Sequence, residues 1–148
     1  MSMNLAFRTP DGEFHHGEVA LDEGTTNPRR GSTTRSDFNE RLLALIDAVD
    51  DVNYGYLMYS IDDEFTGFDT QGFARQILST AIACTMDWLS KHPSIEYLVF
   101  TGATKDGTNN RPRVYRALAQ LMAAKYGFKA FSEPTGHRRD VMFALQVR

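Results

Sequence analysis

Apolar residues along this chain recur with two periods, one typical of strands and one typical of helices. Between residues 54 and 61 they alternate on both sides of the chain, which indicates a strand with both faces covered. Between residues 72 and 92 they occur nearly all round a helical wheel, which predicts a deeply packed helix. The same reasoning predicts strand, helix, strand and strand over residues 95–101, 112–126, 130–131 and 141–147.

The N-terminal third has weaker signals. Residues 3–7 and 14–21 are candidate strands of a hairpin, because Thr9-Pro10-Asp11-Gly12 between them is typical turn chemistry. Residues 23–36 contain almost nothing apolar and predict a flexible loop. Ser36 is a good helix cap, and apolar residues then recur at helical spacing across residues 37–50, from Phe38 to Val49.

These elements predict a single α/β domain over residues 1–148. A helix that joins two strands usually returns the chain in the same direction, so at least one strand pair should be parallel and the sheet mixed. The apolar run Tyr97–Phe100 is the best candidate for a buried central strand, flanked by the helices over residues 72–92 and 112–126.

Composition narrows the class of protein. The chain has 148 residues, 42% hydrophobic and 24% charged, which is typical of a globular protein. The single cysteine, Cys84, excludes an internal disulfide and favours a cytoplasmic location. No apolar run is long enough to span a membrane, so no transmembrane segment is expected. The four histidines are not spaced as metal ligands, so no metal site is expected.

Charge is distributed unevenly. The formal net charge of -3 argues against general affinity for nucleic acid. Residues 105–139 nevertheless carry eight basic residues against two acids, Asp106 and Glu133. One face for an anionic ligand and an ordinary solvated helix with a basic loop both fit this pattern.

The order of the elements from Tyr54 to Arg148 resembles the C-terminal two-thirds of the GCN5-related N-acetyltransferase family. In that family a glycine turn opens a helix, and Gly72-Phe73-Ala74 matches the second half of its signature. A Gly-Phe pair that ends the last helix before two strands is also common there, as at Gly127-Phe128. Small phage-encoded proteins with acetyltransferase-like folds look similar over residues 113–126.

The resemblance implies a three-layer acetyltransferase-like fold that binds acetyl-CoA and transfers its acyl group to an amine of a protein or small molecule. The CoA pyrophosphate would lie against the turn from Gly67 to Ala74, because small residues let backbone N–H groups approach phosphate oxygens at a helix N-terminus. Arg111 and Arg113 would contact CoA phosphates.

The resemblance also suggests catalytic groups. Glu64 would accept a proton from the amine, and Tyr115 would protonate the departing thiolate. Each has an ordinary alternative: Glu64 as a solvated loop acid, Tyr115 as a partly buried helix residue.

Two positions depart from the family pattern. Asp69 replaces the usual Gln or Arg of the glycine turn, and Ala123 occupies the position of the tyrosine that often serves as the acid. These departures support an alternative function, a catalytically inactive member of the fold that binds a partner protein.

Overall fold

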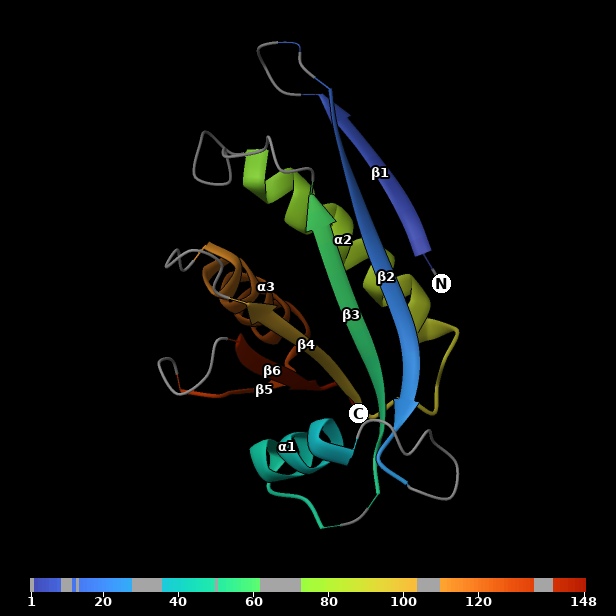
Figure 1. Cartoon of the computed structure of the whole chain (residues 1–148). Helices are drawn as coiled ribbons and strands as arrows, with labels where there is room; N and C mark the ends of the chain where they lie inside the picture. The colour runs from blue at the N-terminus through green and yellow to red at the C-terminus, as the bar shows by residue number, and fades with distance from the viewer. Residues whose placement is uncertain are drawn as a thin grey trace. The chain divides into compact units, whose positions relative to one another are not determined.

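The computed structural model describes residues 2–8, 12, 14–27, 36–49, 51–61, 73–103, 110–134 and 140–148. In chain order the elements are β1 (Ser2–Arg8), β2 (Phe14–Thr25), α1 (Ser36–Ile46), β3 (Asn53–Ile61), α2 (Phe73–Ser90), β4 (Tyr97–Ala103), α3 (Asn110–Tyr126), β5 (Lys129–Ser132) and β6 (Asp140–Gln146). The strands form a six-stranded mixed sheet in the order β1-β2-β3-β4-β6-β5 (Figure 1). The predicted α/β class is confirmed.

The chain divides into two compact units, each of which is described by itself. The first consists of Met1–Asp22 and Leu57–His92, and the second of Glu23–Tyr56 and Pro93–Arg148. In the first unit, β1 and β2 pair antiparallel from Ser2↔Ala20 to Arg8↔Phe14, which confirms the predicted hairpin. Gly12 in its connection has φ of 90°, a conformation that glycine adopts without a steric cost.

Helix α2 of the first unit packs along one stripe in its described part, contrary to the prediction of apolar packing all round. Ala81, Ile82, Thr85, Trp88 and Leu89 are buried at spacings of one, three and four residues. Ala83 and Asp87 are exposed between them. Cys84 is half-buried, and its Sγ atom lies 3.2 Å from the Sδ atom of Met3.

Strand β4 is the centre of the second unit. It pairs parallel with β3, from Tyr54↔Tyr97 to Tyr56↔Val99, and antiparallel with β6 along its whole length. Leu98, Val99 and Phe100 are each 0% exposed, so the predicted buried strand is confirmed.

The faces of β4 and β6 are covered by different helices of this unit (Figure 1). On one face Phe100 stacks on Phe143 with ring centroids 5.5 Å apart, and Tyr115 of α3 lies 5.3 Å from Phe100. On the other, Val99 belongs to a buried cluster with Leu42 and Ile46 of α1. Because successive side chains of a strand point to opposite faces, this alternation places α1 and α3 on opposite sides of the sheet.

Helix α1 ends earlier than predicted. Asp47 has φ of 53°, and the N–H groups of Asp47 and Ala48 donate to the carbonyls of Ala44 and Leu43. This is the double hydrogen bond of a Schellman stop. Val49, predicted to lie on the apolar face of the helix, therefore lies beyond it and is 98% exposed.

Helix α3 ends as predicted at Gly127, which has φ of 73° and donates its N–H to the carbonyl of Ala123. Leu118 and Met122 are buried, but Leu121, which stands beside them in the helical apolar pattern, is 47% exposed. At a rotation of 100° per residue Leu121 lies about 60° from Leu118 and about 100° from Met122, at the edge of the buried face.

The predicted loop over residues 23–36 is wrong at its start, because Glu23–Thr25 belongs to β2. Thr26 anchors the end of this strand: its N–H donates to the carbonyl of Val52 at 3.0 Å, and its hydroxyl accepts from the Val52 N–H at 2.9 Å. Residues 28–35 lie outside the described part of the chain.

Gly24 lies against the ring of Tyr54, so close that an added Cβ atom would be 2.4 Å from Cζ. Tyr54 is only 2% exposed and has Phe38 packed 5.6 Å from its ring, so the ring has little room to move. We expect Gly24→Ala to lower the free energy of unfolding by about 1–3 kcal/mol, the usual cost of overpacking. Urea titration measures this value. In a Tyr54→Leu background the same substitution should cost much less, and an equal cost in both backgrounds would contradict the close approach.

Candidate functional site

The glycine turn that the sequence assigns to CoA precedes helix α2. Gly67, Gly72 and Glu64, with Asp69, fall within residues 62–72, outside the described residues. Helix α2 begins at Phe73, directly after Gly72, and Ala74 is its second residue. Its first turn contains no acidic residue, so no side chain of that turn neutralises the positive end of the helix dipole.

Arg111 and Arg113 lie in the first turn of α3, which begins at Asn110. Pro112, predicted as the first helical residue, is thus the third. A first turn tolerates proline because its N–H groups have no partner within the helix. This turn also lacks an acidic residue, so both arginines stand where the helix dipole opposes positive charge.

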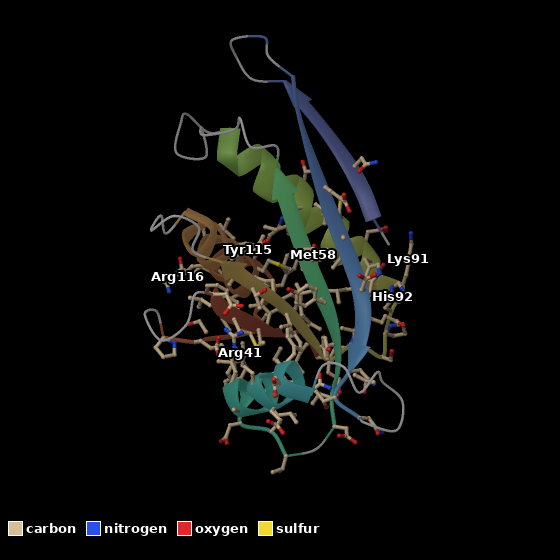
Figure 2. The ribbon with its side chains drawn as sticks, viewed as in Figure 1. Arg41, Met58, Lys91, His92, Tyr115 and Arg116 are labelled. Atoms are coloured by element: carbon tan, nitrogen blue, oxygen red, sulfur yellow. The ribbon has the colours of Figure 1, made fainter. Side chains whose placement is uncertain are left out.

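Tyr115 of α3 (Figure 2) is 6% exposed. Its ring packs against Phe100 in the core of the second unit. The ring of Tyr115 therefore has a structural role, independent of any catalytic role of its hydroxyl. Ala123, at the position where the resembled family often has its acid, is half-buried. Tyr126 stacks on Phe128, with ring centroids 5.5 Å apart.

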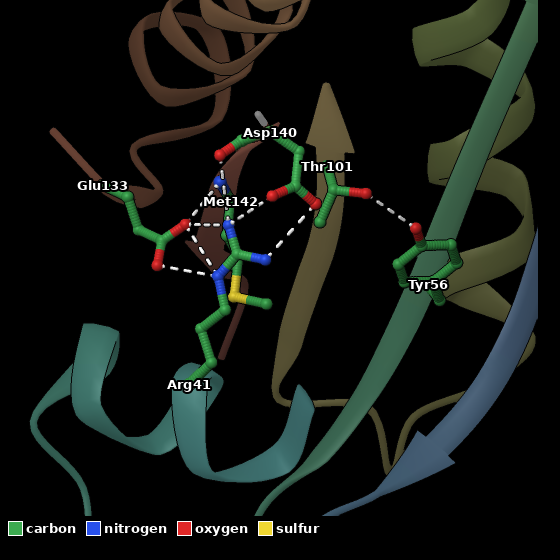
Figure 3. A network of polar contacts seen from close by, with 6 residues as sticks. All are labelled: Arg41, Tyr56, Thr101, Glu133, Asp140 and Met142. Carbon is green, nitrogen blue, oxygen red and sulfur yellow. Dashed lines mark hydrogen bonds and ion pairs between the residues drawn. The ribbon is translucent and has the colours of Figure 1, made fainter. Parts of the chain in front are cut away.

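A polar network that the sequence analysis did not anticipate joins α1 to the two closing strands of the second unit (Figure 3). Arg41 Nε donates to both carboxylate oxygens of Glu133, at 2.9 and 2.8 Å, and Arg41 Nη2 forms an ion pair with Glu133 Oε1. Arg41 Nη2 also lies 3.1 Å from Asp140 Oδ1, and the N–H of Met142 donates to Glu133 Oε1 at 2.8 Å.

The network is partly shielded from water. The side chains of Arg41, Glu133 and Asp140 are 12%, 19% and 36% exposed. Hydrogen bonding to Glu133, and then to Asp140, raises the pKa of Arg41 above its ordinary value against the opposing effect of burial. One cation and two carboxylates give this cluster a formal charge of -1.

A second pair of polar groups lies on the same face of the sheet. The hydroxyls of Tyr56 and Thr101 are 2.8 Å apart, and the ring of Tyr56 meets Phe38 edge-on at 5.6 Å. Thr101 is opposite Met142 in the β4–β6 register and Asp140 is opposite Ala103, so Thr101 and Asp140 are diagonal neighbours (Figure 3). The Tyr56–Thr101 contact joins β3 to β4, whereas the contacts of Arg41 hold α1 against the sheet.

One signal for Arg41 was present in the sequence. It lies three residues after Phe38 and four before Leu45, and so within the apolar stripe of its helix. A charged residue at such a position needs a partner. Its partners are 92 and 99 residues away, a separation that no local pattern reports.

The described residues contain neither a metal-binding cluster nor a membrane-spanning helix. No group of three or more His, Cys, Asp or Glu side chains there is placed to hold a metal ion. None of the described helices combines the length and the apolar character needed to cross a membrane. Comparisons with protein-family models, curated proteins and solved structures gave no match.

The network predicts a strong coupling between Arg41 and Glu133. We expect Arg41→Met to lower the free energy of unfolding by about 2–4 kcal/mol, because it leaves two shielded carboxylates without their cation. Lys91→Met is the control: it breaks an exposed pair with Asp87, 69% and 60% exposed, and should cost less than about 0.5 kcal/mol. A double-mutant cycle with Glu133→Gln measures the coupling, and additive effects would show that the pair contributes nothing.

Proposed function

We propose that this protein is an acyl-CoA-dependent N-acyltransferase that moves an acetyl group from acetyl-CoA to an amine of a protein or small molecule. The observation that carries the proposal is the start of α2 at Phe73, directly after Gly72 and without an acid in the first turn. A helix N-terminus behind a glycine supplies converging N–H groups and positive potential, which suit a pyrophosphate.

The order of elements gives further support. β3 and β4 are a parallel pair joined through α2, and α3 then leads through Gly127 to the two closing strands. That succession is the basis of the resemblance to the acetyltransferase family. Arg111 and Arg113, in an acid-free first turn of α3, suit phosphate oxygens better than they suit helix stability.

The proposed reaction is direct transfer. The lone pair of a neutral amine attacks the thioester carbonyl carbon, the new N–C bond forms, and the C–S bond breaks to release CoA thiolate. The amine proton passes to a base, for which Glu64 is the candidate, and the thiolate takes a proton from Tyr115 or from water. Backbone N–H groups would stabilise the negative charge on the carbonyl oxygen.

Two observations favour the alternative, a binding module without catalysis. Tyr115 is buried against Phe100, and alanine stands at position 123. In this alternative the fold is retained as a scaffold for a partner protein. Binding of acetyl-CoA separates the two functions.

We expect acetyl-CoA to raise the melting temperature, because a ligand that binds only the native state must stabilise it, by about 2.7 kcal/mol at one hundred times its Kd. Gly72→Glu should weaken binding at least about tenfold, since a carboxylate would repel the pyrophosphate. Gly72→Ala is the matched control and should bind nearly as the wild type does, because the added methyl group is small and uncharged. Calorimetric titration measures all three proteins. A wild type that does not bind acetyl-CoA eliminates the transferase, and tight binding by Gly72→Glu eliminates this placement of the pyrophosphate.

Tyr115→Phe tests the acid. The substitution keeps the ring that packs on Phe100 and removes only the hydroxyl, so the fold should be preserved. If Tyr115 protonates the thiolate, turnover falls by about two to four orders of magnitude while the Kd for acetyl-CoA stays nearly constant. Release of free thiol in the presence of primary amines measures turnover. Equal turnover by both proteins would assign the proton to water and leave Tyr115 with its packing role alone.

A further inference from the structure

Helix α3 carries positive charge that no acidic residue of the same helix balances. The helix has four basic residues, Arg111, Arg113, Arg116 and Lys125, and no acid. Side chains three or four residues apart on a helix are neighbours, and neither Arg116 nor Lys125 has an acid at those spacings. Within the described residues, neither of them forms an ion pair with another segment.

Helix stability does not explain this charge. Arg111, Arg113 and Arg116 lie in the first two turns, where the positive end of the helix dipole makes a cation unfavourable by a few tenths of a kcal/mol or more. Lys125, in the last turn, is the one base that the dipole favours, and its Nζ atom lies 5.5 Å from the ring centroid of Tyr126. Arg111 and Arg113 are the proposed contacts of the CoA phosphates, so an external anionic partner is needed only to give Arg116 a role.

Apolar surface lies between the two described cations. Leu121 is 47% exposed, Ala124 is exposed and Ala117 is half-exposed. At 100° per residue these three lie side by side, with Lys125 on one margin of the strip, and the exposed Gln120 followed by Arg116 on the other. The buried residues Tyr115, Leu118, Ala119 and Met122 occupy the opposite side of the helix.

This face has the shape and charge of one half of a helix pair. Two alanines beside one leucine allow a second helix to approach closely, with the leucine side chain as an anchor. From Arg116 to Lys125 the helix rises about 13.5 Å, so two and a half turns of a partner would cover the face.

We propose that the face formed by Arg116, Ala117, Leu121, Ala124 and Lys125 docks an amphipathic helix of a partner protein whose apolar stripe is bordered by acidic residues. Charge complementarity favours this partner: its acidic residues would pair with Arg116 and Lys125, and its apolar stripe would cover the strip between them. A nucleic acid backbone would have no use for the leucine between them, and the net charge of -3 opposes it. The surface is independent of acyl transfer, because none of its residues belongs to the proposed acetyl-CoA site.

The test uses a synthetic 18-residue peptide with leucine at helical spacing and glutamate elsewhere, and a scrambled peptide of the same composition. Fluorescence anisotropy measures binding of each labelled peptide to the full chain. We expect the helical peptide to bind at least tenfold more tightly than the scrambled one, with an affinity that falls as salt is added.

Two pairs of matched variants locate the contact. Arg116→Glu and Leu121→Ser should each weaken binding about tenfold or more. Lys91→Glu makes the same charge change at a side chain that is 69% exposed, and Val49→Ser removes a side chain that is 98% exposed, so both should bind as the wild type does. Circular dichroism checks that every variant is folded, and acetyl-CoA binding should be unchanged in all four.

Three results would overturn the proposal. The first is equal binding of the helical and scrambled peptides, or no binding of either. The second is an equal loss from Arg116→Glu and Lys91→Glu, which would reduce the effect to net charge. The third is a different occupant: an 18-base-pair DNA duplex that binds more tightly than the peptide, or self-association in light scattering that Leu121→Ser abolishes.

Discussion

Burial of β4 and β6 on both faces is the constraint on which the second unit depends. Leu98 and Phe100 face α3, and Val99 between them faces α1, all with 0% exposure. Full burial of one such side chain contributes about 1.5–3 kcal/mol, so these three residues contribute as much as a whole domain's typical net stability. Both helices are therefore needed. Removing either would expose one face of the same strands.

The two helices are held differently. The covering face of α3 is apolar and aromatic: Tyr115 packs on Phe100, which stacks on Phe143, and Leu118 and Met122 are buried. Helix α1 combines an apolar face with the Arg41–Glu133–Asp140 network. Shielded ion pairs often contribute little more than apolar residues of similar size would, but their geometry is directional. The network thus fixes the position of α1 along the strands more than it adds to stability.

The fold was readable from the sequence where local pattern and tertiary structure agree. The run Tyr97–Phe100 between two helical periods could only be a covered strand, and Gly127 marked the helix end. The errors have physical causes. Val49 continued the helical period, but Asp47 adopted the left-handed conformation and ended the helix. Glu23–Thr25 looked like loop, but pairing of Thr26 with Val52 outweighed its polar composition.

The candidate site was harder to predict from the sequence than the fold, because most of its contacts join residues that are far apart in the chain. A short motif such as Gly72-Phe73-Ala74 carries its own chemistry and can be recognised locally. The Arg41 network cannot, because its members come from three segments nearly one hundred residues apart. Tyr115 is a further example. The sequence predicted that it lies in a helix, but it could not predict that its ring packs against Phe100, because that contact depends on where the helix lies on the sheet.

The central functional claim is that acetyl-CoA binds at the N-terminus of α2. Amide chemical shifts from nuclear magnetic resonance, followed during titration with acetyl-CoA, test this residue by residue. The N–H groups of Phe73 and Ala74 should show large, saturable shifts, because hydrogen bonds to phosphate oxygens act directly on those protons. The amide chemical shift of Lys91, which directly follows the C-terminal end of α2, should not change. Saturable binding that leaves Phe73 and Ala74 unperturbed, or no binding, would contradict the claim.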